Sequence, residues 1–234
     1  MVNTRTRAAR VIDRVVTGRR SLDAALADGL TGLPDTRDRA LVQELAYGTL
    51  RWYFQLDAVL GALLNKSLKA RDSDLRCLLL GGLYQLRHMS VPAHAAINET
   101  VQAARELDKA WATGLVNAVL RNCQRRQTAL ERVIAASESA CYAHPGWLIE
   151  RVRADWPDDW QDILQAGNQR PPFALRVNRR QLDRDGYLAL LREQGIEAQP
   201  LTHASYGIRL GSPLPVDALP GFADGAVSVQ DGAA

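Results

Sequence analysis

The spacing of apolar residues changes once along this chain, and that change limits the folds that the chain can adopt. From residue 4 to residue 137, apolar residues recur at three- and four-residue intervals, the period of helices with one buried face. After the Pro171–Pro172 pair, the segment FALRVN alternates apolar and polar residues, which is typical of a half-buried strand. The sequence therefore predicts a mainly α fold, an all-α helical bundle followed by a small α+β domain.

The helical part contains about seven predicted helices. Gly48 lies inside the longest of them, and because glycine lowers helix stability, it predicts close packing of a neighbouring helix. Tyr47 and Trp52 could stack on bases, but the pattern favours a place in the core. His88 and His94 are expected to be structural, because a metal site needs more ligands. The predicted helices span residues 4–17, 21–29, 35–64 with a kink, 72–89, two within 91–126, and 129–137.

The two adjacent helices within residues 91–126 end in a cluster of arginines. Pro92 lies where a helix tolerates a missing N–H, and apolar residues then recur on one face of each helix. Arg121, Arg125 and Arg126 fall in the last turns of the second helix, where cations complement the helix dipole. The same positions suit phosphate binding. Both interpretations of this cluster stay open from the sequence.

The first predicted helix and the residues just beyond it carry six arginines against a single acidic residue, and three of the arginines lie opposite the apolar face. Such a concentration of positive charge predicts a surface for a nucleic-acid backbone. A solvated outer face is the alternative. The first-helix group comprises Arg5, Arg7, Arg10, Arg14, Arg19 and Arg20.

A domain boundary is predicted after residue 141, with a helical domain at 1–141 and a helical linker plus the small α+β domain at 142–234. Two short helices, each preceded by a proline, open the second part. Bulky tryptophans fall close together here and are expected to serve as apolar anchors. They are Trp147, Trp156 and Trp160.

The α+β domain carries a second group of polar side chains. On the FALRVN strand, Phe173, Leu175 and Val177 form the apolar face. The other face and the following turn carry arginines that suit a nucleic-acid backbone, although an edge strand protected from pairing by its charge is the alternative. The candidate residues are Arg176, Asn178, Arg179 and Arg180. A helix from Asp183 to Gly195 and strands at 197–201, 207–210 and 226–229 complete the prediction.

The overall composition sets further limits. Of 29 basic residues, 26 are arginine, which suits phosphate binding and base stacking, although the net charge is only +3. No stretch approaches about eighteen uninterrupted apolar residues, and the N-terminus lacks the apolar core of a signal peptide. Cys77, Cys123 and Cys141 form no C-x-x-C pair and are expected to be small buried residues with reduced thiols. We therefore expect a monomeric cytoplasmic protein without a metal site or membrane attachment.

Several motifs resemble a known family. The motif P-x-H-A-A-I-N-E-x-V-x-x-A-R, from Pro92, and G-L-V-N-A-V-L-R-N, from Gly114, closely resemble the helical core of NusB-like RNA-binding domains. The resemblance is to the version that begins bacterial 16S rRNA cytosine-C5 methyltransferases of the RsmB family. HPGWLIERV and NQRPPFALRVN resemble the segments that follow the helical domain in that family. The resemblance implies that residues 1–141 form a NusB-like all-α bundle.

The resemblance also implies a role for the arginines. NusB-like domains carry an arginine-rich N-terminal segment that contacts RNA. We therefore expect the first-helix group and the arginines beside FALRVN to contact one folded 16S rRNA, as a hairpin or a single-stranded loop. The predicted RNA-binding residues are Arg5, Arg7, Arg10, Arg14, Arg121, Arg125, Arg126, Arg176, Asn178, Arg179 and Arg180.

The chemistry of the family would lie outside this chain. RsmB enzymes transfer a methyl group from S-adenosylmethionine, which is held in a doubly wound domain with a Gly-rich turn, and use a later nucleophilic cysteine. The segment VSVQDGAA resembles the lead-in to that domain, and none of the three cysteines matches the catalytic ones in context. The chain is expected to bind RNA, to hold no cofactor, and to be inactive by itself.

Two other functions stay open. The first is a stand-alone NusB-type transcription antitermination adaptor, which would bind RNA and protein. The segment beyond Tyr142 argues against it, because such an adaptor has no need of a strand-bearing second domain. The second is a structural helical module whose arginines have no specific role.

Overall fold

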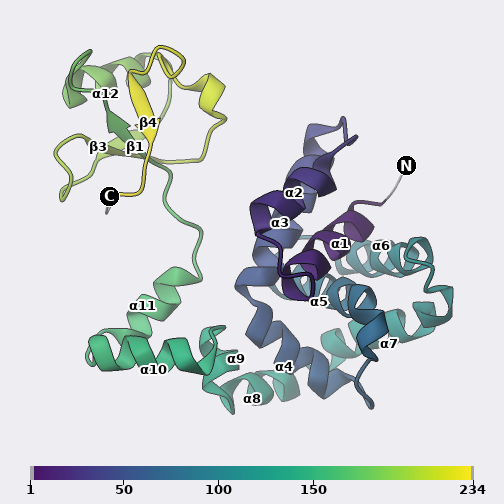
Figure 1. The fold of residues 1–234 in the computed structure, drawn as a ribbon. Coiled ribbons are helices and arrows are strands. Elements are labelled where there is room, and N and C mark those ends of the chain that lie inside the picture. The colour runs from purple at the N-terminus through teal and green to yellow at the C-terminus, as the bar shows by residue number, and fades with distance from the viewer. Residues whose placement is uncertain (1–2, 233–234) are drawn as a thin grey trace. The chain divides into compact units, whose positions relative to one another are not determined.

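Helices fill the first part of the chain, and a small sheet lies in the second (Figure 1). The structure is a computed structural model that describes residues 3–232. The chain divides into two compact units, Met1–Asn168 and Gln169–Ala234. The predicted fold class, a mainly α protein with a helical bundle followed by a small α+β domain, is confirmed.

The first unit is built around α5 (Ser73–His88), which contacts α1, α3, α4, α6 and α7. Leu75, Leu79, Leu80 and Leu83 of α5 are fully buried, so this helix forms the centre of the core. The other helices are α1 (Thr4–Val16), α2 (Leu22–Leu30), α3 (Thr36–Arg51), α4 (Tyr53–Leu63), α6 (Ala93–Glu106), α7 (Thr113–Arg125), α8 (Gln127–Ala135), α9 (Glu138–Tyr142), α10 (Gly146–Asp155) and α11 (Trp160–Gly167), with 3-10 turns η1 (Ala70–Asp72) and η2 (Ala110–Ala112).

Side-chain caps explain where three of these helices begin. Asn3, Ser21 and Asp35 each accept a hydrogen bond from a backbone N–H in the first turn of α1, α2 and α3, respectively. The helix predicted at 35–64 is two helices instead of one kinked helix, because the backbone leaves helical geometry at Trp52, where φ is −96° and ψ is 15°.

Gly48 of α3 lies against the ring of Tyr84 of α5. A Cβ atom at position 48 would overlap the phenol ring, and Tyr84 is only 4% exposed. The Tyr84 hydroxyl donates to Oε1 of Glu44 at 2.6 Å, which holds the ring in this position. The prediction of close helix packing at Gly48 is therefore confirmed.

Aromatic rings surround His88 at the end of α5. Its imidazole stacks on the half-buried ring of Trp52 with ring centres 4.3 Å apart, and Tyr84 stacks at 5.6 Å. Oε1 of Gln55 accepts a hydrogen bond from Nε2 of His88 at 3.1 Å. His88 is thus part of the packing. Tyr47, in contrast, is 44% exposed, so its predicted place in the core was wrong.

The buried imidazole makes stability depend on pH. Burial lowers the pKa of His88 to about 4, and the charge of Arg87 adds to this effect. The unfolded chain takes up the same proton near the ordinary pKa of about 6.5. The free energy of unfolding should therefore keep its full His88 contribution above about pH 6.5 and lose it as the pH falls toward the folded-state pKa. Urea unfolding across this range should show a shallower pH dependence for His88→Gln. An identical dependence in both proteins would contradict the assignment.

A small separate core joins the last helices of the first unit. Ile149, Val152 and Leu164 are buried together, and Tyr142 and Trp160 pack against them. Contacts of α9 with α8, α10 and α11 group these helices with the bundle, so the first compact unit continues to residue 168, beyond the predicted boundary after residue 141.

Three side chains near this segment are more exposed than expected. Trp147 and Trp156 are 69% and 52% exposed, so neither is an anchor of this core. Cys141 is also exposed, whereas Cys77 and Cys123 are buried free thiols as expected. Cys141 lies in a helix, as its sequence context predicted. This helix, α9, has only five residues, and Cys141 is exposed on it. Burial raises the pKa of Cys77 to about 12, so this thiol is protonated.

The second unit is an antiparallel sheet with strand order β2-β3-β1-β4. Because β1 pairs with β3 on one side and β4 on the other, the FALRVN strand lies inside the sheet, and the charged edge-strand alternative was wrong. The elements are β1 (Ala174–Val177), α12 (Arg184–Glu193), β2 (Ala198–Pro200), β3 (Gly207–Leu210), η3 (Val216–Ala218) and β4 (Val227–Val229).

The two faces of this sheet differ in chemistry. Leu175 and Val177 of β1 share a buried core with Tyr187 and Leu191 of α12. Asp183 starts α12 by accepting a hydrogen bond from the N–H of Gly186 at 2.7 Å, as the sequence predicted. On the opposite face Ala174 is buried but Arg176, Arg209 and Ser228 are exposed, and we call the face that they form the uncovered face. This second face carries the polar side chains of the FALRVN segment.

Candidate nucleic-acid interface

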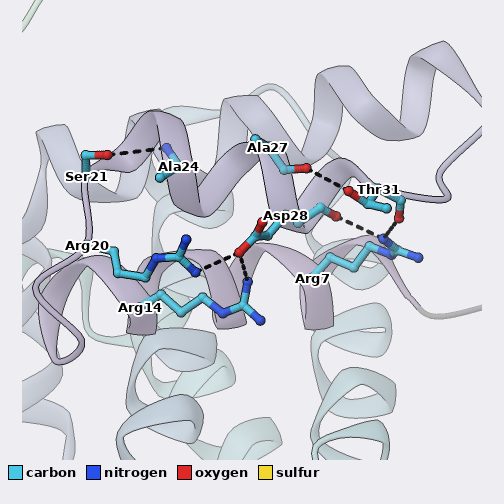
Figure 2. A network of polar contacts seen from close by, with 9 residues as sticks. Arg7, Arg14, Arg20, Ser21, Ala24, Ala27, Asp28 and Thr31 are labelled. Carbon is cyan, nitrogen blue, oxygen red and sulfur yellow. Dashed lines mark hydrogen bonds and ion pairs between the residues drawn. The ribbon is translucent and has the colours of Figure 1, made fainter.

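One arginine of the first-helix group caps the end of α2 (Figure 2). The guanidinium of Arg7 donates to the carbonyl oxygens of Gly29 and Thr31 at 2.9 and 2.8 Å. These carbonyls lie at the C-terminal end of α2, where a helix leaves acceptors without partners. Arg7 therefore attaches α2 to α1, a role that the periodicity of α1 alone does not indicate.

Two further arginines of this group share one carboxylate. Arg14 and Arg20 donate to Oδ2 of Asp28 on α2 at 3.3 and 2.7 Å, as Figure 2 shows. The side chains are 45% and 46% exposed, so each pair contributes less than about 1 kcal/mol to stability. Because two guanidinium groups face a single carboxylate, the cluster keeps a positive charge.

Arg5 lies in the helix packing. Its Nε donates to Oε1 of Gln85 on α5 at 3.2 Å. Burial lowers the pKa of the Arg5 guanidinium, while the charges of Glu99 and Asp38 oppose that shift. Arg5 is therefore half-buried and partnered, away from the outward face of α1.

Arg10 and Arg19 differ from these four arginines. Both side chains are exposed, and neither has a hydrogen bond or ion pair among residues 3–232. Within the first-helix group they are the guanidinium groups that contribute least to the fold. They are consequently the best positions for testing RNA contacts at α1.

Arginines that hold α2 in place and arginines without a partner should differ in their effect on the free energy of unfolding. Replacing Arg7 with methionine keeps the apolar stem but removes two charge-assisted hydrogen bonds, so the free energy of unfolding should fall by about 1–2 kcal/mol. Arg10→Met is the control and should change it by no more than about 0.5 kcal/mol. Urea unfolding measures both values. If Arg7→Met were as stable as Arg10→Met, Arg7 would not hold α2 in place.

The cluster at the end of α7 is fully on the surface. Arg121 donates to Asn117 at 3.0 Å and Arg125 to Asn122 at 2.6 Å, both on the same helix. Arg126 donates to the carbonyl of Ala62 at 3.5 Å, a weak contact to the end of α4. None of these described contacts reaches the last carbonyl oxygens of α7. The interpretation of the arginines as helix caps therefore depends only on their attraction to the helix dipole.

The sheet of the second unit presents arginines on its uncovered face. Arg176 of β1 pairs with Gly207 and Ser228 on the neighbouring strands, and its only described side-chain contact is with Gln230 at 3.5 Å. Arg179 lies over the ring of Tyr206, with 5.5 Å between its guanidinium carbon and the ring centre. These contacts leave most guanidinium donors available.

Asn178 has a different task from its neighbours. Its Nδ2 donates to the carbonyl of Gly225 at 2.9 Å, and its Oδ1 accepts from the backbone N–H of Arg180 at 3.2 Å. The Asn178 carboxamide therefore stabilises the turn after β1, with its nitrogen and its oxygen both hydrogen-bonded within the protein. The RNA contact predicted for Asn178 stays a prediction. The Arg180 side chain itself is exposed.

A hollow of 630 Å³ lies at this face. Arg176, Asn178, Arg179 and Arg180 line it together, so the structure brings all four predicted residues of the second unit to one place. Tyr206, which lies outside the predicted set of residues, forms part of the same wall. Its position next to Arg179 follows from the loop before β3, which no local pattern indicated.

Arg209 is a further cation on the uncovered face. It pairs with Ala174 of β1 across the sheet and donates to Gln199 at 3.2 Å. The alternation of Gly207 and Arg209 with buried Ile208 and Leu210 is the signal that could have identified it.

The part of the chain that the structure describes shows neither a group of metal ligands nor a membrane-spanning helix. No three histidine, cysteine, aspartate or glutamate side chains within residues 3–232 come together as a metal site would require. His94 is exposed. No described helix combines the length and apolar character needed to cross a membrane.

Two family models match successive stretches of the chain. The model of the NusB family matches residues 2–125, and the model of the ferredoxin-like domain of RsmF/B-like methyltransferases matches residues 144–217. A crystal structure of the protein PH0851 is similar to 98% of this chain and 53% of its own, with a TM-score of 0.61 at 15% sequence identity. That likeness shows a shared fold.

Curated relatives are similar over the whole chain. Ribosomal RNA small subunit methyltransferase B of Pseudomonas syringae pv. tomato is 48% identical over 233 residues, which covers 100% of this chain and 52% of the relative. The protein of the same name from Vibrio vulnificus is 43% identical over 233 residues, covering 100% of this chain and 54% of the relative. The chain thus spans about half the length of the curated relatives it matches. The chain therefore belongs to the NusB family and corresponds to the N-terminal NusB and ferredoxin-like domains of the ribosomal RNA small subunit methyltransferase B proteins.

Proposed function

We propose that this chain is the RNA-binding N-terminal region of an S-adenosylmethionine-dependent 16S rRNA cytosine-C5 methyltransferase. It would position an rRNA hairpin for methylation by a C-terminal domain outside residues 1–234. The observation that carries the proposal is the uncovered face of the ferredoxin-like sheet, where Arg176, Arg179 and Arg180 line one hollow without holding the fold together. The name of the relatives supplies the substrate class.

The residues of this face suit the backbone and unpaired bases of RNA. Guanidinium groups donate in pairs to phosphate oxygens, and aromatic rings stack on bases that leave the helix. Arg176 is fixed by a central strand, while Arg179 and Arg180 lie in the turn after it. Tyr206 provides an aromatic ring next to these cations. The face can therefore hold a hairpin by its charge and shape while another domain acts on the base.

The described residues do not fit S-adenosylmethionine. The doubly wound domains that hold this cofactor have parallel strands and a Gly-rich turn between a strand and a helix. Here every strand pair is antiparallel, and the turn from β1 to α12, NRRQLD, contains no glycine. We assign cofactor binding and catalysis to the part of the enzyme outside this chain, and we propose that the chain alone is inactive.

The match of residues 144–217 to the ferredoxin-like domain of RsmF/B-like methyltransferases favours this function over an antitermination adaptor. An adaptor would need the NusB bundle only. We also propose, from the same relatives, that the protein acts in the bacterial cytoplasm, where 16S rRNA is processed, and that it binds RNA as a monomer.

A salt titration tests the proposal. Binding of labelled 16S rRNA hairpins should weaken steeply with salt, with a slope of about 0.7–0.9 in log affinity against log salt concentration for each neutralised phosphate. Fluorescence anisotropy measures it, with scrambled hairpins of equal length as the control. We expect a slope equivalent to at least about three phosphates and tighter binding of one rRNA hairpin than of its scrambled control. A structural module with no specific role would bind weakly and without preference.

A further inference from the structure

A groove of 820 Å³ lies in the first unit, away from the first-helix group. The end of α4, the loop at 64–69 and one side of α7 form its walls. Its floor is apolar, and its rim carries four cationic side chains of which only Arg126 belongs to the predicted RNA-binding set. The rim cations are Lys66, Lys69, Arg71 and Arg126.

The charge of this groove is strongly positive. Lys66 and Lys69 are exposed and have no ion-pair partner among the described residues. Asp72 is the one carboxylate among the described lining residues; Lys109 donates to it at 2.7 Å, and Nε of the rim residue Arg71 lies 3.9 Å from its Oδ2. That carboxylate is thus already neutralised. Lys66, Lys69 and Arg126 therefore face an approaching ligand without an ion-pair partner among the described residues, and Arg71 keeps 77% of its side chain exposed beside its long contact with Asp72.

An exposed aromatic ring stands beside these cations. Trp111, in the 3-10 turn before α7, is 64% exposed and lines the groove. A large apolar ring next to several cations is the arrangement that binds unpaired nucleotides, because the base stacks on the ring while phosphates contact the cations. A purely apolar partner would leave the four charges without counterions, so charge complementarity favours a polyanion with flat apolar groups.

We infer that this groove binds a short unpaired RNA segment that flanks the hairpin, with a base on Trp111 and phosphates at Lys66, Lys69, Arg71 and Arg126. The inference builds on the proposed RNA-binding function but concerns a separate surface. A single strand entering here gives the protein a second contact with the same RNA. Recognition then depends on unpaired nucleotides next to the stem as well as on the stem.

The test compares two RNAs in the intact protein that contains this chain. One is a blunt 16S rRNA hairpin, and the other is the same hairpin with about ten unpaired adenosines on each end, a length within single-strand site sizes. Wild-type protein should bind the extended RNA about tenfold or more tightly than the blunt one. Trp111→Ala and the double variant Lys66→Glu/Lys69→Glu should lose this gain and keep the affinity for the blunt hairpin.

Matched controls keep the test specific. Trp147→Ala removes a tryptophan of 69% exposure outside the groove, and Arg132→Glu reverses an exposed charge on α8. Both should keep the gain, and circular dichroism should show the same helical content in all variants. With 5-iodouridine in place of one adenosine of the extension, photocrosslinking should label Trp111.

The outcomes separate the two proposals. An unchanged gain in Trp111→Ala, or no gain in wild-type protein, would overturn the inference while blunt-hairpin binding still supported the proposed function. Crosslinking of the groove to another protein segment in place of RNA would also overturn it. No binding of either RNA would overturn both.

Discussion

Replacing Arg176, Arg179 and Arg180 together with glutamate should weaken binding of a 16S rRNA hairpin by at least about 100-fold. Three phosphate contacts would become three repulsions on one face. The salt slope should fall by about 1 for each phosphate that the variant no longer neutralises, a change that a structural defect would not produce. Fluorescence anisotropy at several salt concentrations measures both quantities.

The fold should tolerate this triple variant because none of the three side chains has a strong described partner. Arg176 and Arg179 make contacts of 3.5 Å to Gln230 and Tyr206, at the limit of a hydrogen bond. Arg192→Glu, at an exposed position of α12, is the single-site control for Arg180→Glu. An unaltered salt slope in the triple variant would move the RNA surface away from the sheet.

A pair of glycine substitutions should change stability in opposite directions. Gly48→Ala should lower the free energy of unfolding by about 1–3 kcal/mol, because the new Cβ overlaps the Tyr84 ring and helix propensity recovers only about 1 kcal/mol. Displacing the ring also disturbs the hydrogen bond from Tyr84 to Glu44. Gly48→Val should cost more, since its side chain is larger.

Gly61→Ala is the matched control on the neighbouring helix. A Cβ at this position meets no atom within 4 Å, so alanine should raise the free energy of unfolding by about 0.5–1 kcal/mol. Urea unfolding of both variants measures the difference. Stabilisation by Gly48→Ala would show that α3 and α5 are less closely packed than described.

Periodicity was sufficient to predict the element types. The bundle helices and the FALRVN strand follow from spacing alone, because each buries one regular face. It did not predict what Arg7, Arg14 and Arg20 contact. The pattern of α1 shows which side avoids the core, but α2 returns along that side and uses these guanidinium groups. A long-range contact of this kind leaves no local signal.

Contacts between distant segments also explain the other places where the structure differs from the sequence-based prediction. Trp147 and Trp156 have the size of core residues, but burial depends on whether a neighbouring element reaches them. The pairing of β1 on both sides depends on β4, which lies about fifty residues later in the chain. The groove near Trp111 combines residues from α4, a loop and α7, so no single stretch of sequence indicated it.

Asp28 already pairs with Arg14 and Arg20, so an RNA phosphate would have to compete with this carboxylate for their donors. RNA that reached these two side chains would exchange one anion for another, whereas RNA that reached Arg10 would meet an exposed side chain without an ion-pair partner among the described residues. The attraction at the paired arginines is therefore weaker than their number suggests. Under the proposed function, competition within the protein would thus set how strongly this helix pair holds RNA.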